Sequence, residues 1–213
     1  MSTETTIIAA TTDGHVKGQA ADYNTARGTA TLYLVTDTNW IVGQRYTAGP
    51  IYRVWRSYIE FDLSGVTGPV TAAILRMKCY ADSSATDFDI MVMRHAWDTP
   101  FTAGNLESNF DGALVAVVEC VFANSSTLVP GADNDSPPLD VKQIVPGGRV
   151  AFALVSSRDI AGTTPGGDEY VLFNSAEASA GSQPRLVLTI GGGVPVLGGE
   201  FAAPSPLRGS IVR

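Results

Sequence analysis

Two stretches of the chain alternate between apolar and polar residues with the two-residue period of a β-strand. In residues 51–63, the apolar face consists of Ile51, Trp55, Ile59, Phe61 and Leu63, and the polar face of Arg56, Tyr58, Glu60 and Asp62. In residues 70–81, the apolar face consists of Ala73, Leu75, Met77 and Cys79, and the polar face of Arg76, Lys78 and Tyr80. This pattern is typical of an antiparallel sheet with one face on a core and the other in water. We therefore expect two strands, each with one wet face.

Further short apolar or β-branched runs follow the same rule, and glycine- and proline-rich turns separate them. The expected strands are residues 5–10, 28–35, 51–63, 70–81, 88–95, 113–122, 149–156, 169–174 and 185–190. The one expected helical turn is residues 139–145, with Asp140 as its cap and Pro146 as its end. About nine strands with almost no helix predict an all-β fold, specifically a jelly-roll-type two-sheet antiparallel β-sandwich.

The composition changes once along the chain, so we assign residues 1–190 to a single domain and residues 191–213 to a separate segment. That segment is rich in glycine and proline, yet it carries spaced apolar residues: Val194, Val196, Leu197, Phe201, Leu207, Ile211 and Val212. A pure linker is polar and rich in serine and glycine. We therefore expect an extended C-terminal arm that lies in a groove of a protein neighbour or adds a strand to it. The alternative interpretation is a loose tail.

The overall charge narrows the range of partners. The net charge is −7 and the isoelectric point is about 4.7, which argues against binding to nucleic acid or to an anionic membrane surface. No apolar run approaches the length of a membrane span, and the first residues do not form a secretory signal. Two cysteines, Cys79 and Cys120, each fall on the apolar side of an expected strand. We expect buried free thiols, with a single disulfide as the alternative.

Six short pieces resemble, in their order, the DNRLRE-type family, which is related to carbohydrate-binding modules. They are Asp13-Gly-His-Val16 with Gly28-Thr29, Arg56 to Leu63, Ala73 to Met77, Trp97-Asp98-Thr99, Asp140 to Val145, and Phe173-Asn-Ser-Ala-Glu177 followed by Pro184-Arg-Leu-Val-Leu188. The resemblance implies a β-sandwich of carbohydrate-binding type over about residues 10–190. Two positions depart from it, because Glu60 and Ala176 stand where the family has basic residues. These departures weaken the implied binding of glycans by that face of the sheet.

The residues offer little catalytic chemistry. The chain has two histidines, His15 and His95, and none of the common hydrolase, metalloprotease or nucleotide-binding motifs. We interpret His95 as a structural residue and expect no enzyme. Asp133 and Asp135 place carboxylates on alternate residues, as in half of a calcium loop, but the usual glycine and glutamate are missing. A polar surface loop is the favoured interpretation, no cofactor is expected, and a structural calcium ion is the alternative.

Aromatic residues are better candidates for a binding site. Trp40 lies in a polar stretch that we expect to be a loop, residues 36–50, with Tyr46 nearby. Exposed rings stack on sugar faces, so both residues are candidate glycan platforms. The alternative for Trp40 is a buried loop anchor, because tryptophan is highly buried on average.

Two functions remain. The first is a non-enzymatic structural subunit of a large assembly, such as a virion decoration, fibre or capsid-associated protein on a particle surface. Its partners would be neighbouring protein subunits that receive the arm. The alternative is a carbohydrate-binding module that recognises a surface polysaccharide.

Overall fold

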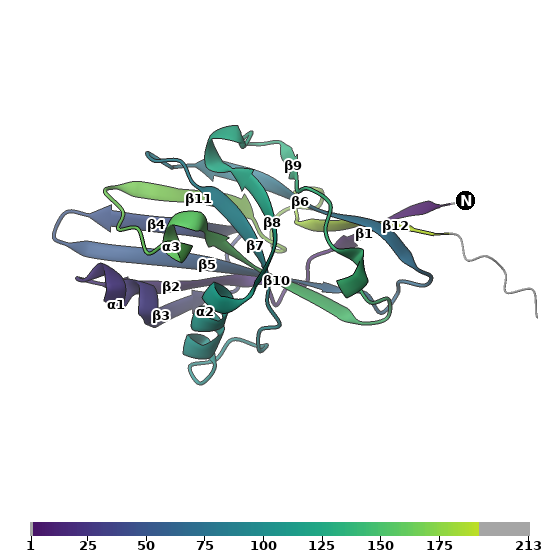
Figure 1. Ribbon diagram of the computed structural model, residues 1–213, viewed down its shortest axis with the longest axis horizontal. Helices are drawn as coiled ribbons and strands as arrows, with labels where there is room; N and C mark the ends of the chain where they lie inside the picture. Colours follow the sequence, from purple (N-terminus) through teal and green to yellow (C-terminus); the bar gives the residue numbers. More distant parts are fainter. Residues whose placement is uncertain (1, 192–213) are drawn as a thin grey trace, which may run out of the picture.

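The computed structural model describes residues 2–191 and shows an antiparallel all-β fold, which confirms the predicted class (Figure 1). The predicted arm residues Val194 to Val212 lie outside the described residues. The strands are β1 (Thr3–Ile8), β2 (Gly14–Ala20), β3 (Ala30–Leu34), β4 (Asn39–Thr47), β5 (Ile51–Asp62), β6 (Val70–Asp82), β7 (Asp89–Arg94), β8 (Val117–Asn124), β9 (Asp133–Asp135), β10 (Arg149–Ser156), β11 (Asp168–Asn174) and β12 (Arg185–Ile190). The helices are α1 (Tyr23–Gly28), α2 (Leu106–Val115) and α3 (Ser157–Ile160), with 3-10 turns η1 (Ser125–Thr127) and η2 (Val141–Gln143).

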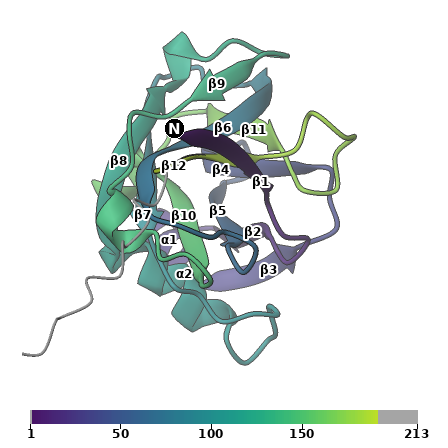
Figure 2. The same ribbon diagram turned by 90° about the vertical axis from the view of Figure 1, so that its right-hand side faces the viewer.

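Hydrogen bonds link the twelve strands into one continuous antiparallel sheet. Its main path runs β1-β12-β6-β11-β4-β5-β10-β7-β8. The long strand β6 makes the continuity possible, because residues 70–76 pair with β12 and residues 79–82 pair with β11. Viewed along its long axis, the bent sheet surrounds a common interior (Figure 2).

That interior is the main core. Ile59 and Phe61 of β5 and Leu63 just after it are fully buried in it, together with Leu75 and Met77 of β6. The predicted apolar face of β6 is confirmed. That of residues 51–63 is confirmed from Ile59 onward, whereas Ile51 is only partly buried and Trp55 is buried outside this cluster. Side chains from strands far apart in the sequence thus pack together in one apolar cluster, and the burial of this cluster is the main source of stability.

The opposite face of β5 is not wet, which corrects the expectation for Arg56 and Tyr58. Both side chains are fully buried, although Asp62 at the end of the strand is exposed. The cover comes from α2, whose Phe110 and Ala113 pack with Tyr58 in a second apolar cluster. A second core therefore lies on the side of the sheet that the sequence pattern assigned to water.

Helix α2 also corrects the start of a predicted strand. We expected a strand over residues 113–122, but residues 113–115 end the helix and β8 begins at Val117. Leu106, Asn109, Phe110 and Ala113 recur at helical spacing, and all four face the second core. The predicted helical turn is confirmed as η2, whose cap residue Asp140 accepts a hydrogen bond from the backbone N–H of Lys142. Over residues 2–191, no helix has the length and apolar character needed to cross a membrane.

Candidate functional site

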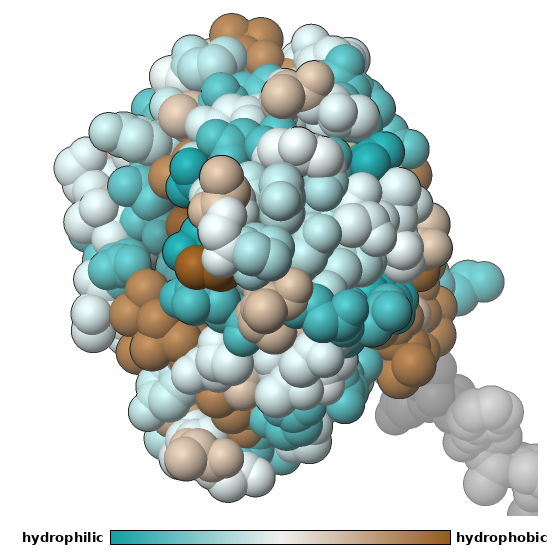
Figure 3. Space-filling view, turned by 90° about the vertical axis from the view of Figure 1, so that its left-hand side faces the viewer, coloured by the Kyte–Doolittle hydropathy of each residue, from teal (hydrophilic) through white to brown (hydrophobic). Residues whose placement is uncertain are grey.

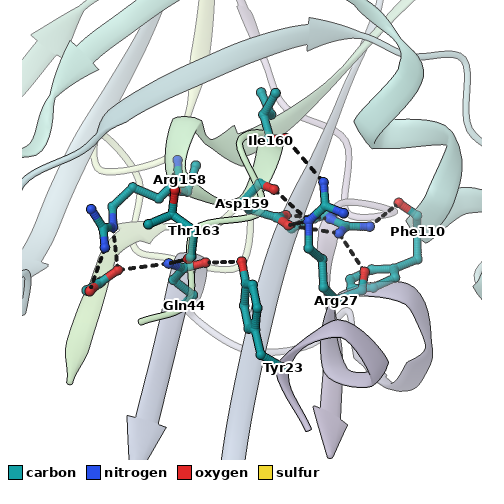
Figure 4. Close-up of polar contacts among 11 residues, drawn as sticks. Tyr23, Arg27, Gln44, Phe110, Arg158, Asp159, Ile160 and Thr163 are labelled. Atoms are coloured by element: carbon teal, nitrogen blue, oxygen red, sulfur yellow. Dashed lines mark hydrogen bonds and ion pairs between the residues drawn. The ribbon is translucent and has the colours of Figure 1, made fainter. Parts of the chain in front are cut away.

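A buried ion pair lies where the sheet branches. One edge of β5 pairs with β2, and the other edge pairs with β4 along residues 51–55 and with β10 along residues 57–62. Arg56 stands between these two pairings, and its guanidinium binds both carboxylate oxygens of Asp159 in α3, at 2.7 and 3.1 Å. Both side chains are fully buried. Figure 4 shows Asp159 close to Arg27 in this part of the molecule.

The remaining donors of Arg56 tie the three helices together. One nitrogen donates to the carbonyl of Phe110 in α2 at 2.6 Å, and another donates to the carbonyl of Arg27 in α1 at 2.8 Å. The guanidinium carbon lies 3.7 Å from the centre of the Phe110 ring, which is cation–π distance. Arg27 in turn reaches Asp159, at 3.2 Å from a carboxylate oxygen. A single buried arginine therefore bonds to all three helices.

A second group of polar side chains continues the network along β4. The side-chain amide of Gln44 donates to Glu169 at 2.8 Å and to the carbonyl of Thr163 at 2.7 Å, and its oxygen accepts from the hydroxyl of Tyr23. Arg158 binds Glu169 through two nitrogens. Burial raises the pKa of the Tyr23 hydroxyl well above its usual range. Each group has a partner, so we interpret the network as the element that fastens the helices to the sheet.

A buried carboxyl lies on the other side of the sheet, just before β2. Asp13 is fully buried and accepts a hydrogen bond from the backbone N–H of Ala176 at 3.1 Å. Burial and the neighbouring Glu177 carboxylate raise the pKa of Asp13 to about 8, against the lowering effect of the Ala176 N–H and the Trp40 indole. Asp13 is therefore mostly protonated at neutral pH and joins the turn after β11 to the start of β2.

Trp40 is not a glycan platform, and that prediction is wrong. The stretch expected to be a loop is strand β4, and the Trp40 side chain is 1% exposed in the main core. A ring covered on both faces by protein has no surface to offer a sugar. The alternative that we considered, a buried anchor, describes it better.

Tyr46 keeps a partly exposed ring at the end of β4. It lies opposite Tyr52 of β5, with ring centres 4.9 Å apart, and Tyr52 meets the edge of Tyr23 at 5.9 Å. Figure 3 looks at the end of the molecule that carries the β4–β5 hairpin. The middle of that surface is mixed and mostly hydrophilic, and hydrophobic residues gather in separate clusters at its margins. Tyr46 and Tyr52 are therefore the aromatic pair that remains available near this end.

The half calcium loop is also corrected. Asp133 and Asp135 belong to strand β9, which pairs with β6, so their side chains lie on one face of a strand. Asp133 forms an ion pair with Arg185, and Asp135 forms a two-pronged ion pair with Arg76. Arginine thus occupies the carboxylates that a calcium ion would need. Within residues 2–191, no group of three or more potential metal ligands is found.

The histidine and the cysteines singled out in the sequence occupy packed positions. His95 lies against Gly112 of α2, where a Cβ atom would come within 2.6 Å of the imidazole, and burial lowers the pKa of His95. Cys79 is buried and Cys120 is half-buried, and both are free, so the disulfide alternative is not formed. Burial raises the pKa of each thiol to about 11, which leaves both in the unreactive protonated form at neutral pH.

An exposed apolar edge is the feature that sequence reasoning missed. β8 is the last strand of the sheet, and within residues 2–191 its one partner strand is β7. Four valines at the end of α2 and along β8 are exposed; they are Val115 at 85%, Val117 at 73%, Val118 at 48% and Val121 at 40%. We call this group the valine edge. The run of valines was visible in the sequence, but it was assigned only to an expected strand, residues 113–122.

One hollow adjoins the valine edge, and a second lies next to the first. The first, of about 280 Å³, is lined by Arg94, Val117, Val118, Glu119, Asp140 and Gln143. The second, of about 190 Å³, shares Arg94 and Gln143 with the first and extends to Ala96 and β10. Arg94 forms an ion pair with Glu119, which in turn accepts the backbone N–H of Asp140. The two hollows therefore lie on either side of Arg94, which donates to the carbonyl of Gln143, and we call them together the groove.

Comparisons with known proteins add no identity. No known family model matches the chain, and no curated protein is significantly similar to it. The resemblance to the DNRLRE-type family therefore stays a prediction.

Proposed function

We propose that this protein is a non-enzymatic structural subunit of a large assembly, of the kind that decorates or builds the surface of a virion. The scaffold would be a jelly-roll-type sandwich of carbohydrate-binding type, and residues 191–213 would be the arm that docks on a neighbouring subunit. The observation that carries this proposal is the valine edge. Contiguous apolar patches at the edge of a sheet mark protein–protein contacts.

The energetics favour a covered valine edge. Fully burying a valine side chain contributes about 1.5 kcal/mol or more relative to leaving it in water. Val115 and Val117 are each more than two-thirds exposed, and both Val118 and Val121 retain a large exposed fraction. A partner that covers all four valines would therefore gain several kcal/mol, enough to shift an association equilibrium by orders of magnitude.

The polar and charged groups of the buried network support a structural role. Arg56, Asp159, Gln44 and Glu169 bond to one another and to backbone carbonyls, so they are engaged in holding the helices. The proposal assigns them to the scaffold and assigns contact with partners to the surface.

Sedimentation of the full chain over a range of concentrations tests the proposal. We expect self-association that increases with concentration and is weakened when Val196 and Leu197 of the arm are both replaced by aspartate. A full chain that stays monomeric at every concentration would refute it. A substitution at exposed Val129, Val129→Asp, is the control and should leave association unchanged.

A second candidate function, a carbohydrate-binding module, is supported by the Tyr46–Tyr52 pair. Two neighbouring, partly exposed rings can stack on a sugar face. On a glycan array, this function predicts binding that Tyr46→Ala weakens and that Tyr80→Ala, at an exposed tyrosine of β6, leaves intact. An array without hits would rule it out.

A further inference from the structure

We propose that the valine edge and its groove are the receptor for residues 192–213 of a second copy of this chain. The inference rests on the proposed function and adds the position of the docking site. It concerns the surface formed by Val117, Val118, Arg94, Asp140 and Gln143.

The shape of the edge favours side-chain insertion over the addition of a regular strand. The register of β8 against β7 shifts twice, between Ile90 and Met91 and between Val92 and Met93. Such bulges twist an edge strand and interrupt its row of backbone donors and acceptors, which opposes continuation of the sheet. The two adjoining hollows instead provide room for apolar side chains of an extended segment.

The sequence of residues 192–213 fits such a groove. Val194, Val196 and Leu197 lie close together around Pro195, and glycines flank the group, so neighbouring apolar side chains can enter neighbouring hollows. Proline fixes its own backbone angle and lacks an N–H group, which suits a ligand that is held by side chains. The spacing of these residues therefore matches the receptor better than it matches a strand partner.

Residues 192–213 are long enough to reach a second molecule. The described chain ends at Gly191, whose N–H donates to the carbonyl of Pro69, and the end of β12 lies opposite the β4–β5 hairpin (Figure 1). Residues 192–213, fully extended, can span up to roughly 70 Å. That length is enough to leave one molecule and cross a face of the next.

The charges of residues 192–213 and of the receptor are complementary as well. The segment contains Arg208 and Arg213 against a single acidic residue, Glu200, whereas the whole chain carries a net charge of −7. The receptor presents the exposed carboxylate of Asp140 at the rim of the first hollow, and the two arginines that line the hollows, Arg94 and Arg149, are each paired with a glutamate. Attraction between an arginine-bearing segment and an acidic partner favours encounter between two copies.

Two complementary variants of the full chain test the inference. The receptor variant carries Val117→Asp and Val118→Asp and keeps its arm, and the arm variant carries Val196→Asp and Leu197→Asp and keeps its receptor. Both pairs of substitutions place charge where apolar contact is proposed. Because Val117 and Val118 are exposed, the receptor variant should fold, and the circular dichroism spectrum checks this.

We expect each variant alone to be monomeric in sedimentation velocity, and an equal mixture to form a complex of one copy of each. The mixture associates because one intact arm meets one intact receptor. A receptor variant that still self-associates like the unaltered chain would place the receptor elsewhere and leave the proposed function standing. A mixture without complex would overturn the inference. An unaltered chain that is monomeric would overturn the proposed function itself.

Discussion

The buried ion pair gives a quantitative prediction about what holds the fold together. Arg56→Ala removes four hydrogen bonds: two to Asp159, one to the carbonyl of Phe110 and one to the carbonyl of Arg27. It leaves the Asp159 carboxylate buried without its main partner, and breaking a buried pair in this way costs about 3–5 kcal/mol. Because Arg27 stays 3.2 Å from Asp159, we expect the loss to fall toward the lower end of that range.

Arg76→Ala is the matched control. Arg76 makes the same two-pronged contact with Asp135, but that pair is at the surface, with 32% and 41% of the two side chains exposed. Solvent screening limits such pairs to about 0–1 kcal/mol. Urea unfolding, followed by tryptophan fluorescence and circular dichroism, gives the free energy of unfolding of each variant. Equal losses in Arg56→Ala and Arg76→Ala, or a loss below about 1 kcal/mol for Arg56→Ala, would refute the reasoning.

Three further predictions concern pH, close packing and the thiols. The pKa of Asp13 is about 8 in the folded state and 3.8 in the unfolded chain, so the free energy of unfolding should fall as the pH rises from 3.8 to 8. The pKa of His15 is lowered from 6.5 to about 4, and this opposes the fall only below pH 6.5. The melting temperature should therefore drop between pH 6.5 and 8 in the unaltered protein and stay level in Asp13→Asn. Gly18→Ala should destabilise the fold strongly, because the new Cβ atom would lie 1.8 Å from the carbonyl oxygen of Ala26. Gly28→Ala is the control and should not destabilise the fold, because a Cβ atom there has no neighbour within 4 Å. Equal melting temperatures of the two variants would contradict this. A thiol-reactive dye at pH 8 should label Cys79 slowly in the folded protein and rapidly in urea, and fast labelling of the folded protein would show that the thiol is accessible.

Local alternation predicted the parts of the fold that local sequence controls. The apolar faces of β6 and of β5 from Ile59 onward are where the two-residue period placed them, and the Asp140 turn is capped as expected. The closing strand β12 was also expected, although its partners β1 and β6 are not encoded in its own residues. The alternation of apolar and polar residues was sufficient to predict which side chains are buried wherever a strand buries one face only.

The errors occurred where burial depends on partners far away in the sequence. Arg56 looked like a surface residue, because Asp159, which neutralises it, lies 103 positions further on. Gln44 and Gly43 made β4 look like a loop, yet Gln44 is fully buried and is bonded to Glu169, 125 positions away. Trp40 was placed at the surface for the same reason. A single sequence does not reveal which distant residue will be the hydrogen-bond or ion-pair partner of a polar side chain. The residues of a buried polar network are therefore predicted to be exposed to solvent.

The valine edge shows the opposite problem. Its residues are apolar and were expected in a strand, but β8 lies at the end of the sheet and nothing within residues 2–191 covers Val115 and Val117. Hydrophobicity alone does not distinguish a strand inside the sheet from one at its edge. Only the order of the strands identifies β8 as an edge strand of the sheet within residues 2–191.

Site-specific cross-linking tests the central claim most directly. A photoreactive amino acid at position 197 of the full chain is irradiated in an equal mixture of isotopically light and heavy protein, and the cross-linked peptides are identified by mass spectrometry. We predict links between light and heavy copies, from position 197 to the segment that contains Val117, Val118 and Glu119 or to the neighbouring Gln143. Links within one copy, or links between copies that map to another surface, would contradict it.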